Sequence, residues 1–256
     1  MFEALAIVTG TAATAAGLAG GYYATYAVRS QVFGETVWRG TTDTNAISLT
    51  FDDGPGEDTE QILDVLKDYG VKATFFMVGR QVEKLPEVAR RIVREGHQIG
   101  NHSLSHSIYL YQLPGTTRRE LDESQNIITR ITGVTPTIAR PPCGVRTPAY
   151  FAASRRLGLR TIQWTVAGFD WKPIPANEIA DNVLKEIQPG SIVLLHDGDD
   201  TLKNRRIETA RALPLIIEGV WSKNLRIAEL EELCSNFDQL EPPPEPIPLG
   251  GNNIYE

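Results

Sequence analysis

The sequence predicts an α/β fold in which a parallel sheet is covered by helices, and the number of its elements suits a closed (β/α) barrel. Two patterns lead to this prediction. Short apolar runs typical of buried strands alternate with helical patterns, and Gly or Pro residues often separate the two kinds of segment. The length of 256 residues is enough for one large domain with a substantial core.

Four elements are expected in the first part of this alternation. Their order is a buried strand at 46–51, a helix from 58 or 59 to 69, a strand at 73–78 and a helix at 86–95. Asp58 or Thr59 can cap the first helix, and Gly70 can end it, because glycine adopts the left-handed conformation without strain. Pro86 suits the first turn of the second helix, and Gly96 can close it.

The alternation continues in the second half of the chain. Thr117 and Glu120 form a capping-box pattern for a long helix that reaches Arg130. Further strands are expected at 137–140, 160–165 and 191–195, and further helices at 149–157 and 177–187. The carboxyl ends of the strands of a parallel barrel lie on one face, so residues that follow these strands should meet there.

The distribution of charge argues against one class of partner. The net charge is -7, but from Glu229 to the C-terminus there are seven acids and no Lys or Arg, while the rest of the chain holds 25 charges of each sign. A neutral body gives no support to nucleic-acid binding. Cys143 and Cys234 are too few for a disulfide framework. The stretch 241–248 holds five prolines, so we expect it to be extended or disordered.

The N-terminal segment is a candidate membrane anchor. Residues 4–28 are 25 residues without a charge, which is long enough to cross a bilayer as a helix. Small residues at four-residue spacing and a cluster of tyrosines favour a membrane helix, whereas a flexible or surface-packed Ala/Gly segment is the alternative. A cleaved signal peptide is disfavoured, because Glu3 is the only charge before the apolar stretch. The orientation of such an anchor and the oligomeric state stay open.

We therefore divide the chain into four parts. They are a hydrophobic helix at 1–30, a connection at 31–45, a catalytic domain at 46–235 and an acidic, Pro-rich tail at 236–256. The expected location is the cell envelope with membrane association, and the cytoplasm is the alternative.

The most informative motif is the pair Asp52 and Asp53, which ends the first predicted strand and precedes Gly54-Pro55. A carboxylate at a strand end needs a partner to offset its desolvation. Neighbouring residues of a strand point to opposite faces, so one acid could hold a metal ion while the other serves another role.

A pair of histidines, His102 and His106, provides suitable partners. On a helical turn their side chains share one face and could bind one ion. The spacing is that of the zinc pair of metalloproteases, but the Glu that serves there as base is missing, so Asp52 is the available base. A site of Asp53 and the two histidines leaves positions open for water and substrate, as catalytic zinc requires. Two ordinary imidazoles are the alternative interpretation, and the remaining His97 is predicted to be structural.

Three further residues follow predicted strands. His196 comes directly after an apolar run and could donate a proton in a cleft. Arg140 precedes Pro141-Pro142 on a stiff turn, and its guanidinium could bind a carboxylate through two hydrogen bonds. Asp170 is one candidate partner for Arg140, and a purely structural ion pair between the two is the alternative.

Five motifs in order resemble the polysaccharide deacetylases with a NodB homology domain, also called carbohydrate esterase family 4. The motifs are residues 50–55 (TFDDGP), 102–106 (HSLSH), 140–144 (RPPCG), 170–171 (DW) and 194–196 (LLH). The resemblance covers roughly residues 46–233. It implies a distorted, often incomplete (β/α) barrel and the removal of acetyl groups from N- or O-acetylated sugars with a divalent metal, usually zinc.

The resemblance also implies roles for particular residues. Asp53, His102 and His106 are similar to the metal ligands of the family, with Asp52 as general base and His196 as general acid. Arg140 resembles the residue that orients the base, and Asp170 resembles an acid that tunes Arg140 or His196. The backbone N–H of Cys143 matches an oxyanion donor, and Trp171 and Leu194 match the walls of a pocket for the acetyl methyl group.

Two positions depart from the family pattern. Cys143 stands where the family commonly has Tyr, and Ala167 stands where many members carry a further acid. A backbone donor survives the first change, and the ligand and catalytic positions are intact, so we predict an active enzyme.

The predicted activity is a metal-dependent hydrolase that removes N-acetyl groups from an amino-sugar glycan similar to peptidoglycan or chitin. The ion is expected to be Zn²⁺, with Co²⁺ or another divalent ion as alternatives. An O-acetyl esterase acting on a xylan-like glycan and a deformylase acting on a lipid-linked sugar are close alternatives. Non-haem iron oxygenase chemistry and a catalytically silent glycan-binding module are more distant ones, because neither needs the additional base, acid and arginine.

Overall fold

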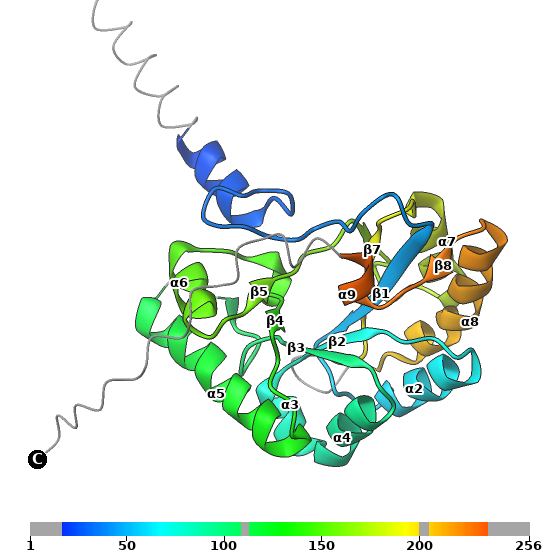
Figure 1. The fold of residues 1–256 in the computed structure, drawn as a ribbon, viewed down its shortest axis with the longest axis horizontal. Helices are drawn as coiled ribbons and strands as arrows, with labels where there is room; N and C mark the ends of the chain where they lie inside the picture. Colours follow the sequence, from blue (N-terminus) through cyan, green and yellow to red (C-terminus); the bar gives the residue numbers. More distant parts are fainter. Residues whose placement is uncertain (1–16, 109–112, 200–204, 235–256) are drawn as a thin grey trace, which may run out of the picture.

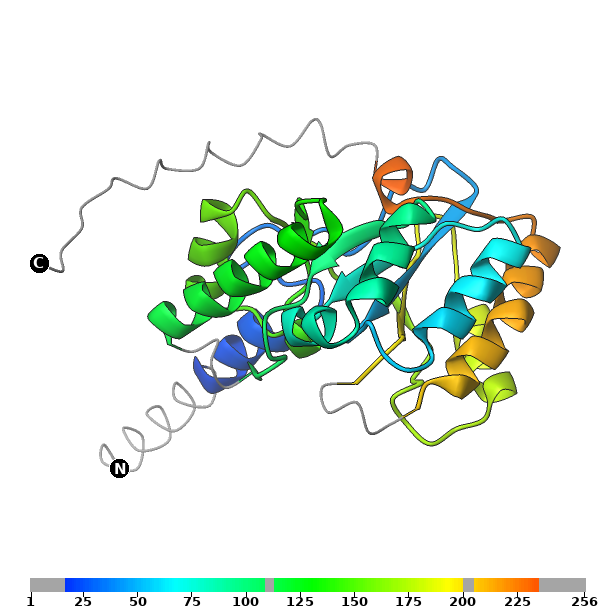
Figure 2. The same cartoon turned by 90° about the horizontal axis from the view of Figure 1, so that it is seen from below.

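The described strands form one curved sheet in which every pair of neighbours is parallel, and helices surround it (Figures 1 and 2). The computed structural model describes residues 17–108, 113–199 and 205–234. The strands follow the order β5-β4-β3-β2-β1-β7-β6, and β8 also pairs with β1. The prediction of an α/β fold with a distorted, incomplete (β/α) barrel is therefore confirmed. The pairings of the described strands run as an open path from β5 to β6, so the full closure that the number of elements suits is not reached.

The elements alternate along the chain as the sequence predicts. The strands are β1 (Ala46–Asp52), β2 (Thr74–Met77), β3 (Gln98–Asn101), β4 (Ile138–Ala139), β5 (Arg160–Thr161), β6 (Val166–Ala167), β7 (Ile192–His196) and β8 (Arg226–Ile227). The helices are α2 (Thr59–Asp68), α3 (Gly79–Lys84), α4 (Pro86–Arg94), α5 (Pro114–Thr132), α6 (Pro148–Arg156), α7 (Ala176–Glu186), α8 (Ile207–Ser222) and α9 (Leu230–Leu233), with a short 3-10 turn, η2 (Pro142–Gly144). Elements β3, α3, β8, α8 and α9 were not expected from the sequence, and β6 separates from the predicted 160–165 strand.

The central strand β1 shows how the sheet orients its side chains. Residues at positions i, i+2 and i+4 of a strand share one face. Ile47, Leu49 and Phe51 belong to the large hydrophobic core between the sheet and the helices. The alternate residues Thr50 and Asp52 therefore face the inside of the curved sheet, and both are buried.

Strand β7 repeats this arrangement beside β1. Val193 and Leu195 belong to the outer core. Leu194 and His196 therefore face the inside, and the register pairs His196 with Asp52. Two polar side chains at the carboxyl ends of neighbouring strands are thus brought to the same face of the sheet.

A second, smaller core fills the opposite end of the curved sheet. Ala46 and Ile192, at the starts of β1 and β7, pack with Leu230 and Leu233 of α9. Figure 2 shows α9 at one end of the strands and the N-terminal helix near the other end. Apolar packing closes the amino-terminal end of the strands, which leaves polar chemistry to the carboxyl end.

The predicted helix caps are only partly correct. Asp58 is the N-cap residue of α2, but its carboxylate accepts bonds from the side chain of Arg205 and the backbone N–H of Arg206 instead of capping the helix. The capping box at Thr117 and Glu120 is wrong, because α5 begins one turn earlier, at Pro114. The boundaries given by Gly70 and Gly96 are correct, since both adopt positive φ directly after α2 and α4.

The N-terminal helix extends over residues 17–26 in the described part of the chain. Residues 1–16, which hold most of the predicted anchor, and the Pro-rich tail at 236–256 lie outside the described residues. Within the described ranges, no helix has both the length and the hydropathy needed to span a bilayer. Membrane association through residues 4–28 stays a prediction.

Candidate metal centre and active site

The predicted site residues converge at the carboxyl end of the sheet. Asp52 ends β1 and His196 ends β7, while His102 directly follows β3. Arg140 follows β4, and Asp170 lies in the segment after β6. Their convergence follows from the parallel arrangement, because each strand delivers its final residues to the same rim.

The two adjacent acids face the same site, which corrects the expectation that they point to opposite faces. Asp53 is not part of the strand, and its φ of 73° places it in the left-handed region. The alternation rule therefore fails at this residue. The carboxylates of Asp52 and Asp53 both approach His102 Nε2, at 3.8 Å and 3.3 Å respectively.

Gly54 allows the chain to bend tightly after the two acids. A Cβ atom at this position would lie 1.9 Å from Oδ2 of Asp197, so a side chain does not fit. The Gly54 carbonyl also accepts a hydrogen bond of 2.9 Å from the backbone N–H of Val78, which ties the bend to the end of β2. The bend is therefore set by close backbone packing around the acids.

The histidine pair lies on a loop, and the prediction of a helical turn is wrong. The φ angles of Ser103 and His106 are 69° and 59°, whereas the residues of a right-handed α-helix have negative φ. The first N–H groups of a helix have no partner within it. Here Gly79 and Arg80 of α3 donate to the carbonyls of Ser103 and Leu104, at 2.9 Å and 3.0 Å, and so hold the loop in place.

Polar side chains complete the support of this loop. Asn101 Oδ1 accepts from the backbone N–H of Ser103 at 2.9 Å, and Ser103 Oγ accepts from the backbone N–H of His106 at 3.0 Å. The carboxylate of Glu120 on α5 accepts from both the backbone N–H and the hydroxyl of Ser105. Glu120, which the sequence suggested as part of a helix cap, is therefore a support of the loop.

Asp53, His102 and His106 form a cluster whose ligand atoms all lie within 4.8 Å of one another. Oδ1 of Asp53 lies 3.3 Å from Nε2 of His102 and 3.0 Å from Nε2 of His106. His102 Nδ1 donates to the Arg140 carbonyl at 2.6 Å, so its Nε2 is left to face the cluster. Asp53 Oδ1 is also buried without a hydrogen-bond partner among the described residues.

This cluster fits a divalent metal ion. Two imidazole nitrogens and one carboxylate oxygen are a ligand set that zinc accepts in catalytic sites. Burial alone would raise the pKa of Asp53, but the neighbouring imidazoles lower it below its ordinary value, so the carboxylate is ionised as a ligand must be. Burial lowers the pKa of His102, whereas Asp52 and Asp53 raise it overall, so the site favours a positive charge between these groups.

Arg140 binds Asp52, and the suggested pairing with Asp170 is wrong. The guanidinium is fully buried and donates through Nη1 to Asp52 Oδ1 at 2.7 Å and to Thr50 Oγ1 at 2.8 Å. Its Nη2 donates to the carbonyl of Gln163 at 3.0 Å. Burial lowers the pKa of Arg140, but the ion pair with Asp52 offsets part of that effect, and an arginine stays charged. Asp52 is therefore fixed in orientation without being a member of the metal cluster.

Asp170 instead pairs with His196. Asp170 Oδ1 accepts from His196 Nδ1 at 2.8 Å, and Oδ2 accepts from the backbone N–H of His196 at 2.7 Å and from Thr209 Oγ1 at 2.8 Å. Burial lowers the pKa of His196, but the charge of Asp170 raises it overall to about 9. The imidazole is thus protonated near neutral pH, with Nδ1 occupied and Nε2 left to the site.

Two of the residues expected to bind the acetyl group lie beside His196, and the third, Cys143, follows Arg140 by three residues. Trp171 is 45% exposed, and its ring lies edge-on to that of His196 with centroids 5.4 Å apart. Leu194 is buried on the inner face of β7, two residues before His196 and on the same face of the strand. Cys143 lies in η2 with a φ of 52°, directly before Gly144, whose φ is 68°. Two consecutive residues of positive φ shape the turn in which the Cys143 N–H lies.

Several supporting residues were missed by sequence reasoning. Thr50 and Thr209 hold Arg140 and Asp170, and their hydroxyls lie in otherwise ordinary strand and helix sequence. Asp197 accepts a hydrogen bond of 2.6 Å from Thr59, and burial raises its pKa to about 7. The only available signal was position, because Thr50 precedes Asp52 by two residues on one face of β1 and Asp197 follows His196 directly.

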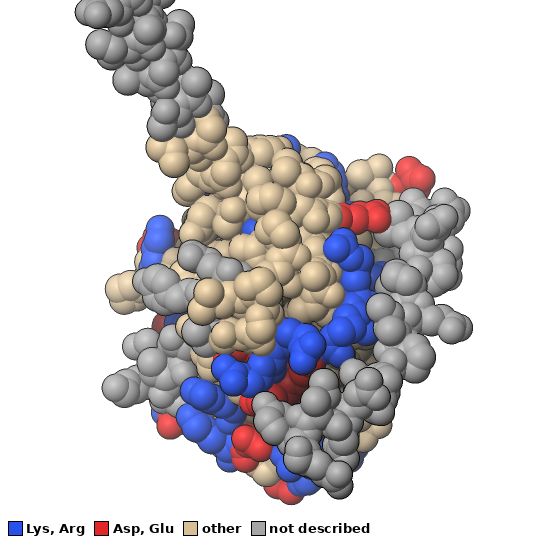
Figure 3. Space-filling model, turned by 90° about the vertical axis from the view of Figure 1, so that its left-hand side faces the viewer, with Lys and Arg blue, Asp and Glu red and all other residues tan. Residues whose placement is uncertain are grey.

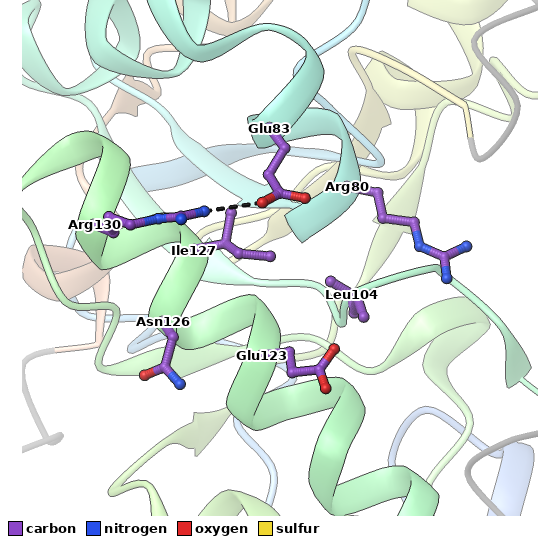
Figure 4. Close-up of a pocket in the computed structure, with 7 residues that line it drawn as sticks. All are labelled: Arg80, Glu83, Leu104, Glu123, Asn126, Ile127 and Arg130. Atoms are coloured by element: carbon purple, nitrogen blue, oxygen red, sulfur yellow. Dashed lines mark hydrogen bonds and ion pairs between the residues drawn. The ribbon is translucent and has the colours of Figure 1, made fainter.

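His97 lies outside the site, in agreement with its predicted structural role. Its Nδ1 accepts from the backbone N–H of Ala73 at 3.2 Å, and burial lowers its pKa to about 4. A separate surface hollow lies between α3 and α5, next to Leu104 of the histidine loop (Figure 4). The Glu83–Arg130 ion pair joins α3 to α5 at this hollow. No residue of the metal cluster is among the described residues that line the hollow.

Known proteins with similar sequences are polysaccharide deacetylases. A family described as Polysaccharide deacetylase matches residues 39–162. A peptidoglycan-N-acetylglucosamine deacetylase of Bacillus cereus is 40% identical over 188 residues, which are 73% of this chain and 67% of the relative. A chitooligosaccharide deacetylase of Bradyrhizobium is 36% identical over 74% of this chain and 91% of the relative.

Solved structures show the same fold. A peptidoglycan N-acetylglucosamine deacetylase bound to 4-naphthalen-1-yl-N-oxidanyl-benzamide matches with a TM-score of 0.73 and 34% identity, over 78% of this chain and 92% of that one. A family 4 acetyl xylan esterase of Clostridium thermocellum, in complex with a cobalt ion, matches with a TM-score of 0.67 and 34% identity, over 73% and 89% of the two chains.

Proposed function

We propose that this chain, which belongs to the polysaccharide deacetylase family and is a hydrolase of carbon–nitrogen bonds, removes N-acetyl groups from N-acetylglucosamine units of a peptidoglycan- or chitin-like glycan and releases acetate. The observation that carries the proposal is the arrangement around Asp52. This carboxylate is held by Arg140 next to the cluster of Asp53, His102 and His106, and β7 brings His196 to its side.

The proposed metal ligands are Asp53, His102 and His106. A divalent ion held there would polarise the acyl carbonyl and lower the pKa of a water molecule. We propose Zn²⁺ because two imidazoles and one carboxylate suit it. The esterase of Clostridium thermocellum that contains a cobalt ion supports Co²⁺ as a functional replacement.

Asp52 is the proposed general base. Its Oδ1 is engaged by Arg140, while its Oδ2 lies 3.8 Å from His102 Nε2 and so faces the cluster. A base must lie within hydrogen-bond reach of the proton that it removes. We expect Asp52 to take a proton from the attacking water as the new carbon–oxygen bond forms.

His196 is the proposed general acid. The amine that leaves when the carbon–nitrogen bond breaks is a poor leaving group unless it is protonated. Nδ1 of His196 is bound to Asp170, so Nε2 is the atom that would donate this proton. Because Asp170 raises the pKa of His196 to about 9, the imidazole carries its proton at neutral pH. Water, base and acid together convert the amide into acetate and a free amine.

Three further residues are proposed to bind the acetyl group. The backbone N–H of Cys143 would donate to the oxyanion that forms on the carbonyl, and a backbone donor does not depend on the Cys side chain. Trp171 and Leu194 would contact the acetyl methyl group beside His196. A cell-envelope location follows from such a substrate and is proposed with it.

The test of this proposal is acetate release from a panel of acetylated glycans. The purified chain is incubated with N-acetylglucosamine oligomers, peptidoglycan and acetylxylan, with and without chelator. We expect release from the N-acetylated substrates, its loss with chelator and its recovery when Zn²⁺ or Co²⁺ is restored. Release only from acetylxylan would favour the esterase alternative, and release of formate from a lipid-linked sugar would favour the deformylase. Binding of glycans without any release would favour a silent module.

A further inference from the structure

A groove lies between the N-terminal helix and two loops of the proposed active site. The helix contributes Leu18, Tyr22 and Tyr26 to its lining, and the loops contribute Ile108 and Val145. Its volume is about 420 Å³. Neither the metal cluster nor the proposed acid and base line it, so the chemistry described above gives this groove no role.

Arg146, a buried residue of the domain, binds the end of the helix and the turn that follows it. The backbone N–H of Arg146 donates to the carbonyl of Thr25 at 3.1 Å. Its guanidinium donates to the carbonyls of Ala27, Val28 and Ser30, and the side chain is 1% exposed. The carbonyl of Thr25 is one of the last carbonyls of the helix, which have no partner within it, and the other three carbonyls belong to the turn that follows the helix. The groove is therefore a built feature of the domain.

Two residues that line the groove lie close in the chain to residues of the proposed active site. Ile108 lies two residues after His106, and Val145 lies two residues after Cys143. Two residues of extended chain span at most about 7 Å. The floor of the groove is thus made by the same two loops that carry a proposed metal ligand and the proposed oxyanion donor.

The lining of the groove suits a neutral sugar chain. The rings of Tyr22 and Tyr26 stack with centroids 5.0 Å apart, and their side chains are 69% and 43% exposed. Aromatic faces pack against the C–H faces of sugar rings, and tyrosine hydroxyls bond to sugar hydroxyls. Among the described residues that line the groove, none is charged.

The surface around the helix is also largely free of Lys and Arg side chains. In Figure 3 the N-terminal helix and the area directly below it are tan, and the Lys and Arg side chains gather farther down. An anionic lipid surface would favour Lys or Arg beside the aromatic residues. The uncharged lining suits a neutral glycan. Tyrosines also suit a membrane interface, so a membrane is the alternative occupant that the vesicle experiment below tests.

We propose that this groove binds sugar units of the glycan chain that lie beyond the unit being deacetylated. The inference rests on the proposed function, because it extends the same substrate from the reacting centre into the groove. Tyr22 and Tyr26 would hold one or two remote sugar rings, and Ile108 and Val145 would form the floor. The groove would make the enzyme prefer long oligomers over short ones.

The test compares substrates of different length. The variant Tyr22→Ala/Tyr26→Ala in the full chain removes both rings, and Tyr23→Ala is the matched control. Tyr23 lies on the same helix and is 52% exposed, but it does not line the groove. We expect kcat/KM for the N-acetylglucosamine hexamer to fall by about 10-fold in the double variant, with the dimer unchanged. The control should stay within about twofold on both substrates.

A binding measurement separates this proposal from the activity. Calorimetry with the hexamer and the inactive Asp52→Asn chain should show weaker binding when Tyr22 and Tyr26 are also removed, whether or not the wild type releases acetate. Equal hexamer binding with and without the two tyrosines would overturn the proposal. Vesicles of phosphatidylglycerol and phosphatidylethanolamine test the membrane alternative. If the two rings are needed for vesicle binding and not for hexamer binding, the groove is a membrane contact and the proposal is wrong.

Discussion

The polar site at the carboxyl end of the sheet and the aromatic groove beside the N-terminal helix differ in how their side chains are held. Asp52, Arg140 and Asp170 are at most 5% exposed, and each has partners that fix its orientation. Tyr22 and Tyr26 are exposed, and their rings stack on each other. Groups that move protons must be oriented before the substrate arrives, whereas groups that select a polymer can stay open to solvent.

This difference predicts two kinds of dependence on substrate. A change in the buried site should lower the rate on every acetylated substrate by a similar factor, because the reacting group is the same. A change in the groove should matter only for substrates long enough to reach it. Variants of the buried site test the first kind of dependence, and the comparison of hexamer with dimer tests the second.

The largest effect is expected from Asp52→Asn. The amide keeps the shape of the carboxylate but cannot take a proton, so kcat should fall by about 10²- to 10⁴-fold. Because the base acts on the water and not on the sugar chain, the loss should be equal for dimer and hexamer. Steady-state acetate release on both substrates measures it. A loss confined to the hexamer would show that Asp52 binds substrate instead of acting as base.

A smaller effect is expected from Asp170→Asn. The carboxylate raises the pKa of His196 to about 9 against the effect of burial, so the protonated acid is present below that pH and lost above it. Without the negative charge the pKa of His196 falls, and the alkaline limb of the kcat profile should move to lower pH. We expect kcat at pH 8 to fall by about 10- to 100-fold.

The pH profile gives a readout that a merely structural role of Asp170 would not change. An alkaline limb that stays at the same pH in Asp170→Asn would contradict the assignment of His196 as acid. A melting curve of the variant serves as the control, because Asp170 also accepts a hydrogen bond from Thr209.

The smallest effect on the rate is expected from Glu120→Ala. Glu120 supports Ser105 in the histidine loop but does not touch the metal cluster. Losing a group that orients the ligands should weaken metal affinity by about 10- to 100-fold. At saturating Zn²⁺ the rate should stay within about threefold of wild type.

A metal titration followed by acetate release measures both quantities for Glu120→Ala. The matched control is Glu123→Ala, an exposed acid of the same helix, which should leave metal affinity unchanged. Equal metal affinity in the two variants would show that the loop does not need Glu120.

The sequence was a good guide to the residues that carry chemistry and a poor guide to the residues that hold them. Asp52, His102 and His196 could be identified because acids and histidines after apolar strands have few structural roles, and parallel strands deliver them to one rim. Motif resemblance then suggested how they divide into ligands, base and acid. The ion pairs could not be assigned, because they depend on the order of the strands in the sheet. Arg140 after β4 reaches Asp52 on β1 across two intervening strands, whereas Asp170 reaches His196 from the segment after the neighbouring strand β6.

The histidine loop shows why local patterns failed. The i, i+4 spacing of His102 and His106 predicted a helical turn, and Thr117 with Glu120 predicted a helix cap. In the fold, the N–H groups of α3 and the carboxylate of Glu120 both bind the loop, so long-range hydrogen bonds replace the local ones. Helix α3 was not predicted, so the hydrogen bonds from its N-terminus that hold the loop could not be foreseen.

The most direct test of the central claim is the metal content of two single variants, Asp53→Asn and Asp52→Asn, measured by elemental analysis beside acetate release. If Asp53 is a ligand and Asp52 is the base, the Asp52→Asn chain keeps one divalent ion per chain and loses activity, while the Asp53→Asn chain loses both. An Asp53→Asn chain that keeps its ion and its activity, or an Asp52→Asn chain that loses its ion, would contradict this division of roles.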